Sequence, residues 1–127
     1  MIITALKPYG LIKAQLDKKD KIGIVSCNSC AKLCETGGEK EMKKLAEKLK
    51  KDDFKVVDMD LIGVPCDFDQ LKKDELHGDV TIVLACDAGV YNLKKLFPKR
   101  KIIEALDTTG LGAWDEKGNL TLVRKFQ

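Results

Sequence analysis

The stretch KIGIVSCNSCAKLCETGGEKEMKKLAEKLKK, residues 21–51, decides the fold class of this chain. Residues 21–27 form a short apolar run with Ile and Val, which predicts a buried strand that ends at Cys27. Residues 38–51 carry apolar side chains at helical intervals and predict an amphipathic helix. Those side chains are Met42, Leu45, Ala46 and Leu49. A strand followed by a helix is the building unit of α/β proteins.

The residues just before this helix carry two further expectations. Thr36 and Glu39 have the spacing of a capping box, in which each side chain bonds the other residue's backbone N–H. Gly37 and Gly38 lie between them and let the backbone approach a ligand closely, while a helix start directs N–H groups toward anions. We therefore expect Gly37 and Gly38 to contribute to cofactor binding. Helix capping is the simpler role for them, and the two roles are compatible.

The remaining residues continue the alternation of strands and helices. Short apolar runs predict three further strands, at 54–60, 80–86 and 101–107. Helical spacing predicts further helices at 8–16, 68–77 and 90–97. Asp67 is a candidate N-cap for the second of these helices, and Pro98 ends the third. Residues 113–123 have strand-like ends around a Gly-containing turn, which predicts a hairpin.

This order of elements predicts an α/β fold. We expect a three-layer, mostly parallel, doubly wound sheet that is flavodoxin- or Rossmann-like, with about four to five strands and a C-terminal hairpin. A length of 127 residues suits one domain, so residues 1–127 are expected to form a single α/β domain.

The composition excludes several classes of protein. Hydrophobic residues make up 44% and charged residues 34% of the chain, which is typical neither of a disordered nor of a membrane-embedded protein. The formal net charge is +3, but lysines alternate with acidic residues and few aromatics accompany them, so we expect no nucleic-acid partner. Residues 1–21 lack the features of a signal peptide, and no run is long enough to span a bilayer. We therefore expect a cytoplasmic protein without a membrane partner.

Sulfur is concentrated in a pattern that calls for a chemical explanation. The chain has five cysteines, namely Cys27, Cys30, Cys34, Cys66 and Cys86. In a reducing compartment, clustered cysteines hold a metal or perform redox chemistry more often than they form disulfides. Cys27 and Cys86 end predicted strands and Cys66 follows a third. Because ligands of parallel α/β sheets bind beyond the carboxyl ends of the strands, all five sulfurs are expected at one edge.

The spacing C-x2-C-x3-C favours a metal cofactor over a reactive thiol. A third cysteine makes Cys27-Asn-Ser-Cys30 a poor thioredoxin-like dithiol, and the loop 27–38 has no arginine to serve a phosphatase-type thiol. A local disulfide would leave the shared edge unexplained. Four thiolates suit structural zinc, which stays open, whereas three close cysteines and a distant fourth are more typical of a [4Fe–4S] cluster. Cys86 is favoured over Cys66 as the fourth ligand, and the sequence leaves this choice open.

Four segments resemble the small C-terminal domain family associated with bacterial methylenetetrahydrofolate reductases, which also occurs as a separate iron–sulfur subunit in anaerobes. They are CNSCAKLCETGGEKE (27–41), PCD (65–67), LACDAGV (84–90) and ALDT (105–108). The resemblance implies a role as the electron-transfer partner of a flavin-containing reductase, the enzyme that makes 5-methyltetrahydrofolate in one-carbon metabolism. The resemblance implies that all five cysteines correspond to family cysteines, with the cluster among them. Fuller members add a second cysteine-rich segment, which is lacking here, so we expect one cluster.

These observations give one leading hypothesis and two alternatives. The leading hypothesis is an electron-transfer protein or subunit with one [4Fe–4S] cluster, whose partner is a flavin-containing methylenetetrahydrofolate reductase subunit or another redox protein. The first alternative is a structural zinc module that docks onto the reductase. The second is a flavodoxin-like flavin site. The loop that would bind the flavin phosphate contains thiols, and this argues against a flavin. No residue is predicted to be catalytic, although residues 107–109 lie where they could touch a ligand or partner.

Overall fold

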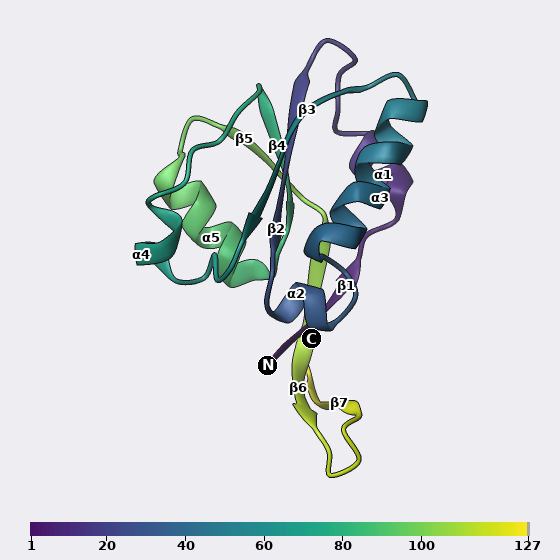
Figure 1. Ribbon diagram of the computed structural model, residues 1–127, viewed down its shortest axis with the longest axis vertical. Helices are drawn as coiled ribbons and strands as arrows, with labels where there is room; N and C mark the ends of the chain where they lie inside the picture. The colour runs from purple at the N-terminus through teal and green to yellow at the C-terminus, as the bar shows by residue number, and fades with distance from the viewer. Residues whose placement is uncertain (127) are drawn as a thin grey trace.

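A four-stranded parallel sheet with the order β3-β2-β4-β5 forms the centre of the molecule (Figure 1). The computed structural model describes residues 1–126. The strands are β2 (Lys21–Cys27), β3 (Lys55–Ile62), β4 (Val80–Leu84) and β5 (Lys101–Glu104). β2 pairs in parallel with both β3 and β4, and β4 pairs in parallel with β5. The predicted α/β class is therefore confirmed, together with a parallel sheet.

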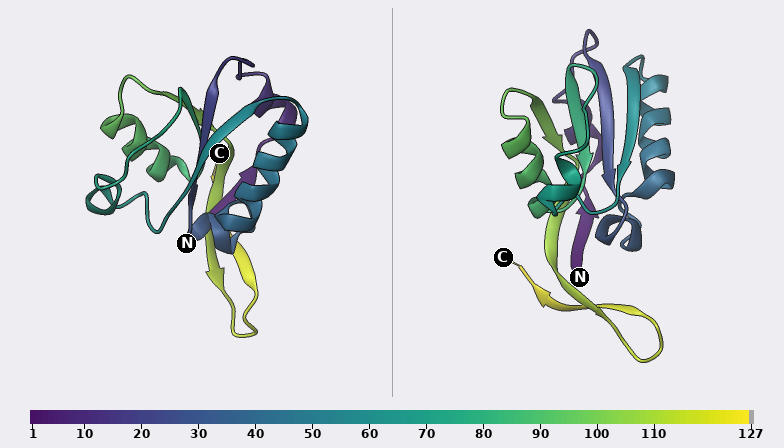
Figure 2. Two further views of the ribbon diagram at one scale, coloured as in Figure 1. Left: turned by 45° about the horizontal axis from the view of Figure 1, so that its top comes forward. Right: turned by 60° about the vertical axis from the view of Figure 1, so that its left-hand side comes forward.

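Helices cover both faces of this sheet. Helix α3 (Gly38–Lys51) packs against β2 and β3, while α5 (Asp87–Leu96) packs against β5 on the opposite side, with α4 (Phe68–Leu71) beside it (Figure 2, right). Two short helices, α1 (Tyr9–Lys13) and α2 (Cys30–Leu33), complete the set. Among residues 1–126, no helix has both the length and the apolar character needed to cross a membrane.

The core lies on the two central strands. All five residues of β4 are buried, as are all residues of β2 after Lys21. Strands of a parallel sheet that are covered on both faces consist of nearly continuous apolar residues, because neither face meets water. The fully buried side chains from these strands include Ile22, Ile24, Ile82, Val83 and Leu84. This buried pair of strands fixes where their carboxyl ends, and the loops that follow, must lie.

The strand and helix at 21–27 and 38–51 are found with the predicted bounds. The predicted helix at 68–77 is shorter, because α4 ends at Leu71, although Asp67 caps it as expected by accepting from the Asp69 N–H at 3.1 Å. Helix α5 begins three residues before its predicted start, at Asp87. These differences lie at element ends, where sequence patterns carry the least information.

The C-terminal hairpin is confirmed, but it belongs to a second sheet that the sequence patterns do not predict. Strands β1 (Ile2–Leu6), β6 (Leu106–Trp114) and β7 (Leu120–Lys125) form an antiparallel sheet with the order β1-β6-β7. The single strand predicted at 101–107 is wrong, since β5 ends at Glu104 and β6 begins at Leu106. β1 pairs with a strand about a hundred residues later, and such a partner leaves no local signal in the sequence.

The predicted capping box at the start of α3 is wrong. The N-cap is Gly37, and no side chain caps it. Instead, the Thr36 hydroxyl pairs with the Thr4 hydroxyl of β1 at 2.6 Å, which ties the loop before α3 to the second sheet. The N–H of Gly38 donates to Ser26 Oγ of β2 at 2.7 Å, so a buried strand hydroxyl takes the place of the missing cap.

Replacing Ser26 with alanine is expected to lower the free energy of unfolding by about 1–3 kcal/mol, because it leaves the buried Gly38 N–H without an acceptor. Urea denaturation under reducing conditions measures the change. Thr121→Ala is the matched control, since it removes an exposed hydroxyl that donates to the Ala113 carbonyl, and we expect a change below about 0.5 kcal/mol. Equal losses in the two variants would contradict the capping role of Ser26.

A phenol–carboxylate contact joins α1 to the end of α3. Tyr9 OH donates to Asp52 Oδ2 at 2.7 Å. Burial, followed by the hydrogen bond and the charge of Asp52, raises the pKa of Tyr9 from 10.0 to about 12. The same hydrogen bond is the main cause that lowers the pKa of Asp52. The folded chain therefore holds the Tyr9 proton more tightly than the unfolded chain does.

The contact between Tyr9 and Asp52 stabilises the fold, and we expect this stabilisation to be lost in alkali. The folded pKa of Tyr9 lies above the unfolded value, so its contribution is complete below pH 10 and is lost as the pH rises from 10.0 to about 12. Near-ultraviolet titration of tyrosinate should show a step near pH 12 that disappears in Tyr9→Phe and persists in Tyr91→Phe. Persistence of the step in Tyr9→Phe would contradict this assignment.

Candidate metal centre

Three cysteines lie at the carboxyl edge of the parallel sheet. Cys27 is the last residue of β2, and Cys86 is the N-cap of α5, two residues after the end of β4. Cys66 lies in the loop between β3 and α4. Because β2, β3 and β4 are parallel neighbours, these loops emerge side by side. All five cysteines of the chain are free thiols.

Cys27 is the most buried of the five thiols, with 6% of its surface exposed. Its sulfur accepts a hydrogen bond from the Ser29 N–H at 3.3 Å. The adjacent loop is fixed to the end of β3, because the Asn28 N–H donates to the Ile62 carbonyl at 2.8 Å and the Ser29 hydroxyl to the Gly63 carbonyl at 2.7 Å. The strand end thus presents this sulfur at a defined position.

Cys30 and Cys34 lie one turn apart on α2. The Cys34 N–H donates to the Cys30 carbonyl at 2.9 Å, so the two side chains leave the same face of this short helix. Cys34 Sγ donates to the Ile2 carbonyl of β1 at 3.5 Å. Cys34 is therefore directed toward the second sheet, whereas Cys30 begins the turn next to Cys27.

The charge environment of Cys66 shows which thiols are near it. Burial raises the pKa of the Cys66 thiol, and electrostatic interaction with Cys86, Cys27 and Cys30 raises it further. Like charges act in this way only over short distances, so these four sulfurs from three separate loops share one region. The structure thus brings together Cys27, Cys30, Cys66 and Cys86, and it gives Cys34 a different neighbour.

The loop that carries Cys66 is held by contacts with α5. Asn92 Nδ2 donates to the Pro65 carbonyl at 3.2 Å. A Cβ atom added at Gly89 would lie 3.1 Å from Pro65 Cγ, so α5 packs closely on the loop at this position. Cys66 itself is exposed, whereas Cys30 and Cys86 are half-buried. One side of the thiol cluster therefore faces solvent.

The N-terminus of α5 has a partner that the sequence does not predict. The Asp87 N–H donates to Thr108 Oγ1 of β6 at 2.9 Å. Thr108 thereby holds the start of α5, and with it Cys86, against the second sheet. The sequence places Thr108 near this edge but gives no signal for the contact, because β6 belongs to a sheet that local patterns do not reveal.

The thiols are neighbours without forming a compact ligand shell. Among residues 1–126, no three His, Cys, Asp or Glu side chains are placed to hold one metal ion. The donors are nevertheless of one chemical kind, and thiolates select zinc, copper(I) or iron–sulfur clusters. The donor set fits a thiolate-bound cofactor in its chemistry and its position. The cysteine side chains must rearrange before their sulfurs can all reach such a cofactor.

Gly37 and Gly38 serve close packing in this structure. The Gly37 N–H donates to the Ala31 carbonyl at 2.9 Å, and the Gly38 N–H is bonded to Ser26. A Cβ atom at Gly37 would lie 2.7 Å from Ser26 Oγ, and Gly38 adopts a φ of +88°. Both N–H groups are thus engaged within the protein, and a role of these glycines in cofactor binding stays a prediction.

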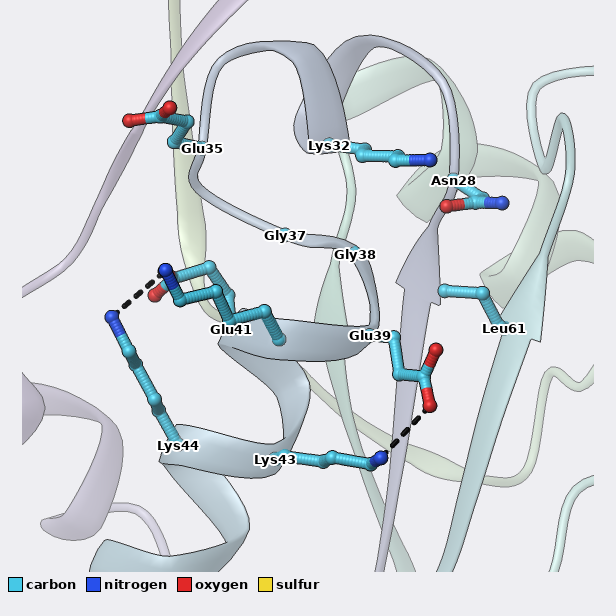
Figure 3. Close-up of a pocket in the computed structure, with 11 residues that line it drawn as sticks. Asn28, Lys32, Glu35, Gly37, Gly38, Glu39, Glu41, Lys43, Lys44 and Leu61 are labelled. Atoms are coloured by element: carbon cyan, nitrogen blue, oxygen red, sulfur yellow. Dashed lines mark hydrogen bonds and ion pairs between the residues drawn. The ribbon is translucent and has the colours of Figure 1, made fainter.

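A cavity of about 790 Å³ lies beside the cysteine loop, between the start of α3 and β3 (Figure 3). Asn28 and Lys32 line it on the loop side, but no cysteine does among the residues that the structure describes. Its charged side chains are partly paired with one another, as in Glu39–Lys43 at 2.8 Å and Glu41–Lys44 at 3.3 Å (dashed in Figure 3). The cavity is therefore adjacent to the thiol cluster and distinct from it.

Comparisons of this chain with protein-family models, with curated proteins and with solved structures find no match.

Proposed function

We propose that this chain is an electron-transfer protein or subunit that binds one [4Fe–4S] cluster through Cys27, Cys30, Cys66 and Cys86. The observation that supports the proposal most is the convergence of these four thiols from three loops at one edge of the sheet. The strand order β3-β2-β4-β5, with helices on both faces, agrees with a doubly wound, flavodoxin-like layout. In such folds, this edge is where cofactors bind.

The choice of ligands differs from the sequence expectation in one residue. The sequence favours Cys34 together with Cys27, Cys30 and Cys86. We replace Cys34 by Cys66 because Cys66 lies near the other three thiols, whereas the Cys34 thiol is bonded to the Ile2 carbonyl. Cys34 then remains as a spare thiol one helical turn from Cys30.

A cluster accommodates widely spaced sulfurs better than a single ion does. Four thiolates around one zinc ion, each about 2.3 Å from the metal, must approach one another to about 3.8 Å. A cubane cluster binds each thiolate at a different iron atom, so its ligands stay further apart. Because no three His, Cys, Asp or Glu side chains among residues 1–126 are placed to hold a single ion, we favour the cluster over zinc. When bound, such a cluster accepts and donates single electrons.

The surrounding residues would serve an anionic cofactor. The Ser29 N–H already donates to the Cys27 sulfur, and hydrogen bonds of this kind are one means of setting a reduction potential. The start of α5 next to Cys86 contributes the positive end of a helix dipole. Buried Cys27 would shield the cofactor on its inner side, while exposed Cys66 marks the side where a redox partner approaches.

We further propose a flavin-containing methylenetetrahydrofolate reductase subunit as the partner. This part of the proposal is supported by the resemblance of residues 27–41, 65–67, 84–90 and 105–108 to the family associated with that enzyme. The free thiols agree with a reducing compartment, and we place the protein in the cytoplasm. We assign the chain no catalytic residue of its own.

Iron and sulfide analysis of anaerobically purified protein tests the proposal. We expect about four iron and four acid-labile sulfide per chain, and an EPR signal on reduction. The protein should also be reconstituted with iron and sulfide in the absence of zinc chelators. If it then holds one zinc per chain and no iron, this result would favour the structural zinc module instead. A colourless product with neither metal would contradict both.

A further inference from the structure

A β-ribbon projects from the body of the molecule. Strand β1 pairs with β6 as far as Leu111, and Met1 exchanges two backbone hydrogen bonds with Gly112, so only beyond Gly112 does β6 pair with β7 alone. We call residues 110–125 the arm, and Figures 1 and 2 show it extending away from the parallel sheet and the helices. Within residues 1–126, no further strand pairs with β7. A two-stranded ribbon in water is marginally stable by itself, so the arm gains from a covering partner.

One face of the arm is apolar. Gly110 and Gly112 form its floor, and large side chains lie over them. A Cβ atom at Gly110 would meet Leu122 Cδ1 at 2.7 Å, and one at Gly112 would meet Ile3 and Leu120. Trp114 lies opposite Leu120 in the register and extends the same face toward the tip. Trp114 and Leu122 are 52% and 51% exposed.

We propose that the arm packs on the arm of a second copy of this chain, apolar face to apolar face, in a two-fold symmetric dimer. The exposed area agrees with this occupant. A compact monomer of 14.1 kDa exposes about 6,700 Å², whereas this chain exposes 7504 Å². The excess of about 800 Å² is comparable in size with the area that each partner buries in an interface of standard size.

The charges of the arm are complementary to those of a second arm that runs in the opposite direction. The tip carries Asp115 and Glu116 beside Lys117, while Arg124 and Lys125 lie at the base. Lys125 lies opposite Gly110 in the register and therefore shares the apolar face. A two-fold axis across this face places each acidic tip over Lys125 of the other copy. Opposite charges therefore meet twice in the dimer.

The edge of β7 is less suited to this contact than the face. The register of β6 and β7 shifts between Leu111 and Gly112, which leaves Val123 as an extra residue in β7. Such bulges, together with exposed cations such as Arg124 and Lys125, are devices that disfavour pairing of a strand edge with another chain. Packing through the face keeps the sheet edge unpaired and buries Trp114 and Leu122.

Sedimentation of the full chain over a range of concentrations, with reductant present to prevent disulfide dimers, tests the proposal. We expect a dimer whose dissociation constant rises more than about tenfold in Leu122→Lys, because the substitution places a charge in an apolar contact. Leu11→Lys on α1 is the matched control: Leu11 is 58% exposed and lies outside the arm. It should leave the dissociation constant unchanged.

The only tryptophan of the chain gives a second measurement. Trp114 becomes buried in the dimer, so its fluorescence maximum should shift to shorter wavelength as the concentration of wild-type protein rises. The shift should be absent in Leu122→Lys and present in Leu11→Lys. Because both are surface substitutions, far-ultraviolet circular dichroism should show an unchanged fold in each.

A charge exchange tests the antiparallel arrangement. Lys125→Glu and Glu116→Lys each place like charges together twice in a homodimer, and each should weaken it. Mixing the two variants restores opposite charges at both ends, so they should form a heterodimer more tightly than either forms a homodimer. Asp115 is left unchanged because its carboxylate accepts from the N–H groups of Lys117 and Asn119 in the turn.

Three results would overturn the proposal. These are a wild-type chain that stays monomeric at every concentration, equal weakening by Leu122→Lys and Leu11→Lys, and a mixture of the charge variants that associates no better than its components. Because apoprotein suffices for all three measurements, failure of this proposal is independent of whether the thiols bind a cluster.

Discussion

Replacing one proposed ligand with serine is expected to lower the iron and sulfide content of anaerobically purified protein by more than about tenfold. The four variants are Cys27→Ser, Cys30→Ser, Cys66→Ser and Cys86→Ser. A serine hydroxyl is a far weaker ligand for iron than a thiolate, and three remaining thiolates leave one iron atom of the cluster without its ligand. Each variant should also lose the EPR signal of the reduced protein. Inductively coupled plasma analysis and a sulfide assay measure the change.

Cys34→Ser is the matched control for this series. Its thiol donates to the Ile2 carbonyl at 3.5 Å, and a serine hydroxyl can donate to the same acceptor. The variant should therefore retain its iron and sulfide. The opposite result, in which Cys34→Ser loses the cluster and Cys66→Ser retains it, would return the ligand set to the one that the sequence favours. Retention of the cluster in Cys27→Ser would refute the proposed site as a whole.

Gly78→Ala is expected to lower the free energy of unfolding by about 3 kcal/mol or more. Gly78 adopts a φ of +86°, which an L side chain rarely adopts, and an added Cβ atom would lie 2.5 Å from the Lys21 carbonyl oxygen. That backbone cannot move freely, because the same carbonyl accepts from the Asp79 N–H at the start of β4. The substitution thus combines conformational strain with a clash between the loop before β4 and the first residue of β2.

Gly118→Ala separates these two effects. Gly118 has a similar φ of +81°, but a Cβ atom there would meet no atom within 4 Å. The control should therefore show only the conformational cost, about 1 kcal/mol. Urea denaturation of the reduced protein measures both variants. Similar losses in Gly78→Ala and Gly118→Ala would show that the clash with Lys21 is relieved at little cost.

The elements that sequence patterns predict well are those whose signal is local. The strand at 21–27 and the helix at 38–51 are found with their predicted bounds, because an apolar run and a 3.6-residue period are properties of consecutive residues. The capping box is wrong for the converse reason. Thr36 satisfies local spacing, but its hydroxyl pairs with Thr4 of β1, a residue thirty-two positions away.

The candidate site was predictable in part. The order of strands and helices places three cysteines at strand ends, and the structure brings four thiols together there. The sequence spacing groups Cys34 with Cys27 and Cys30, whereas α2 directs the Cys34 thiol to Ile2. Spacing along a chain gives the order of side chains, but the direction of each depends on neighbours that come from elsewhere in the sequence.

By itself, the sequence determined the α/β class, the parallel sheet and the concentration of sulfur at the carboxyl edge of that sheet. These follow from periodicity and from the rule that parallel strands end together. Only the tertiary structure decided which thiols are neighbours, that β1 joins the C-terminal hairpin in a second sheet, and that the arm projects with Trp114 exposed. The physical reason is that each of these depends on contacts between residues far apart in the chain, and such contacts leave no repeating pattern in the sequence.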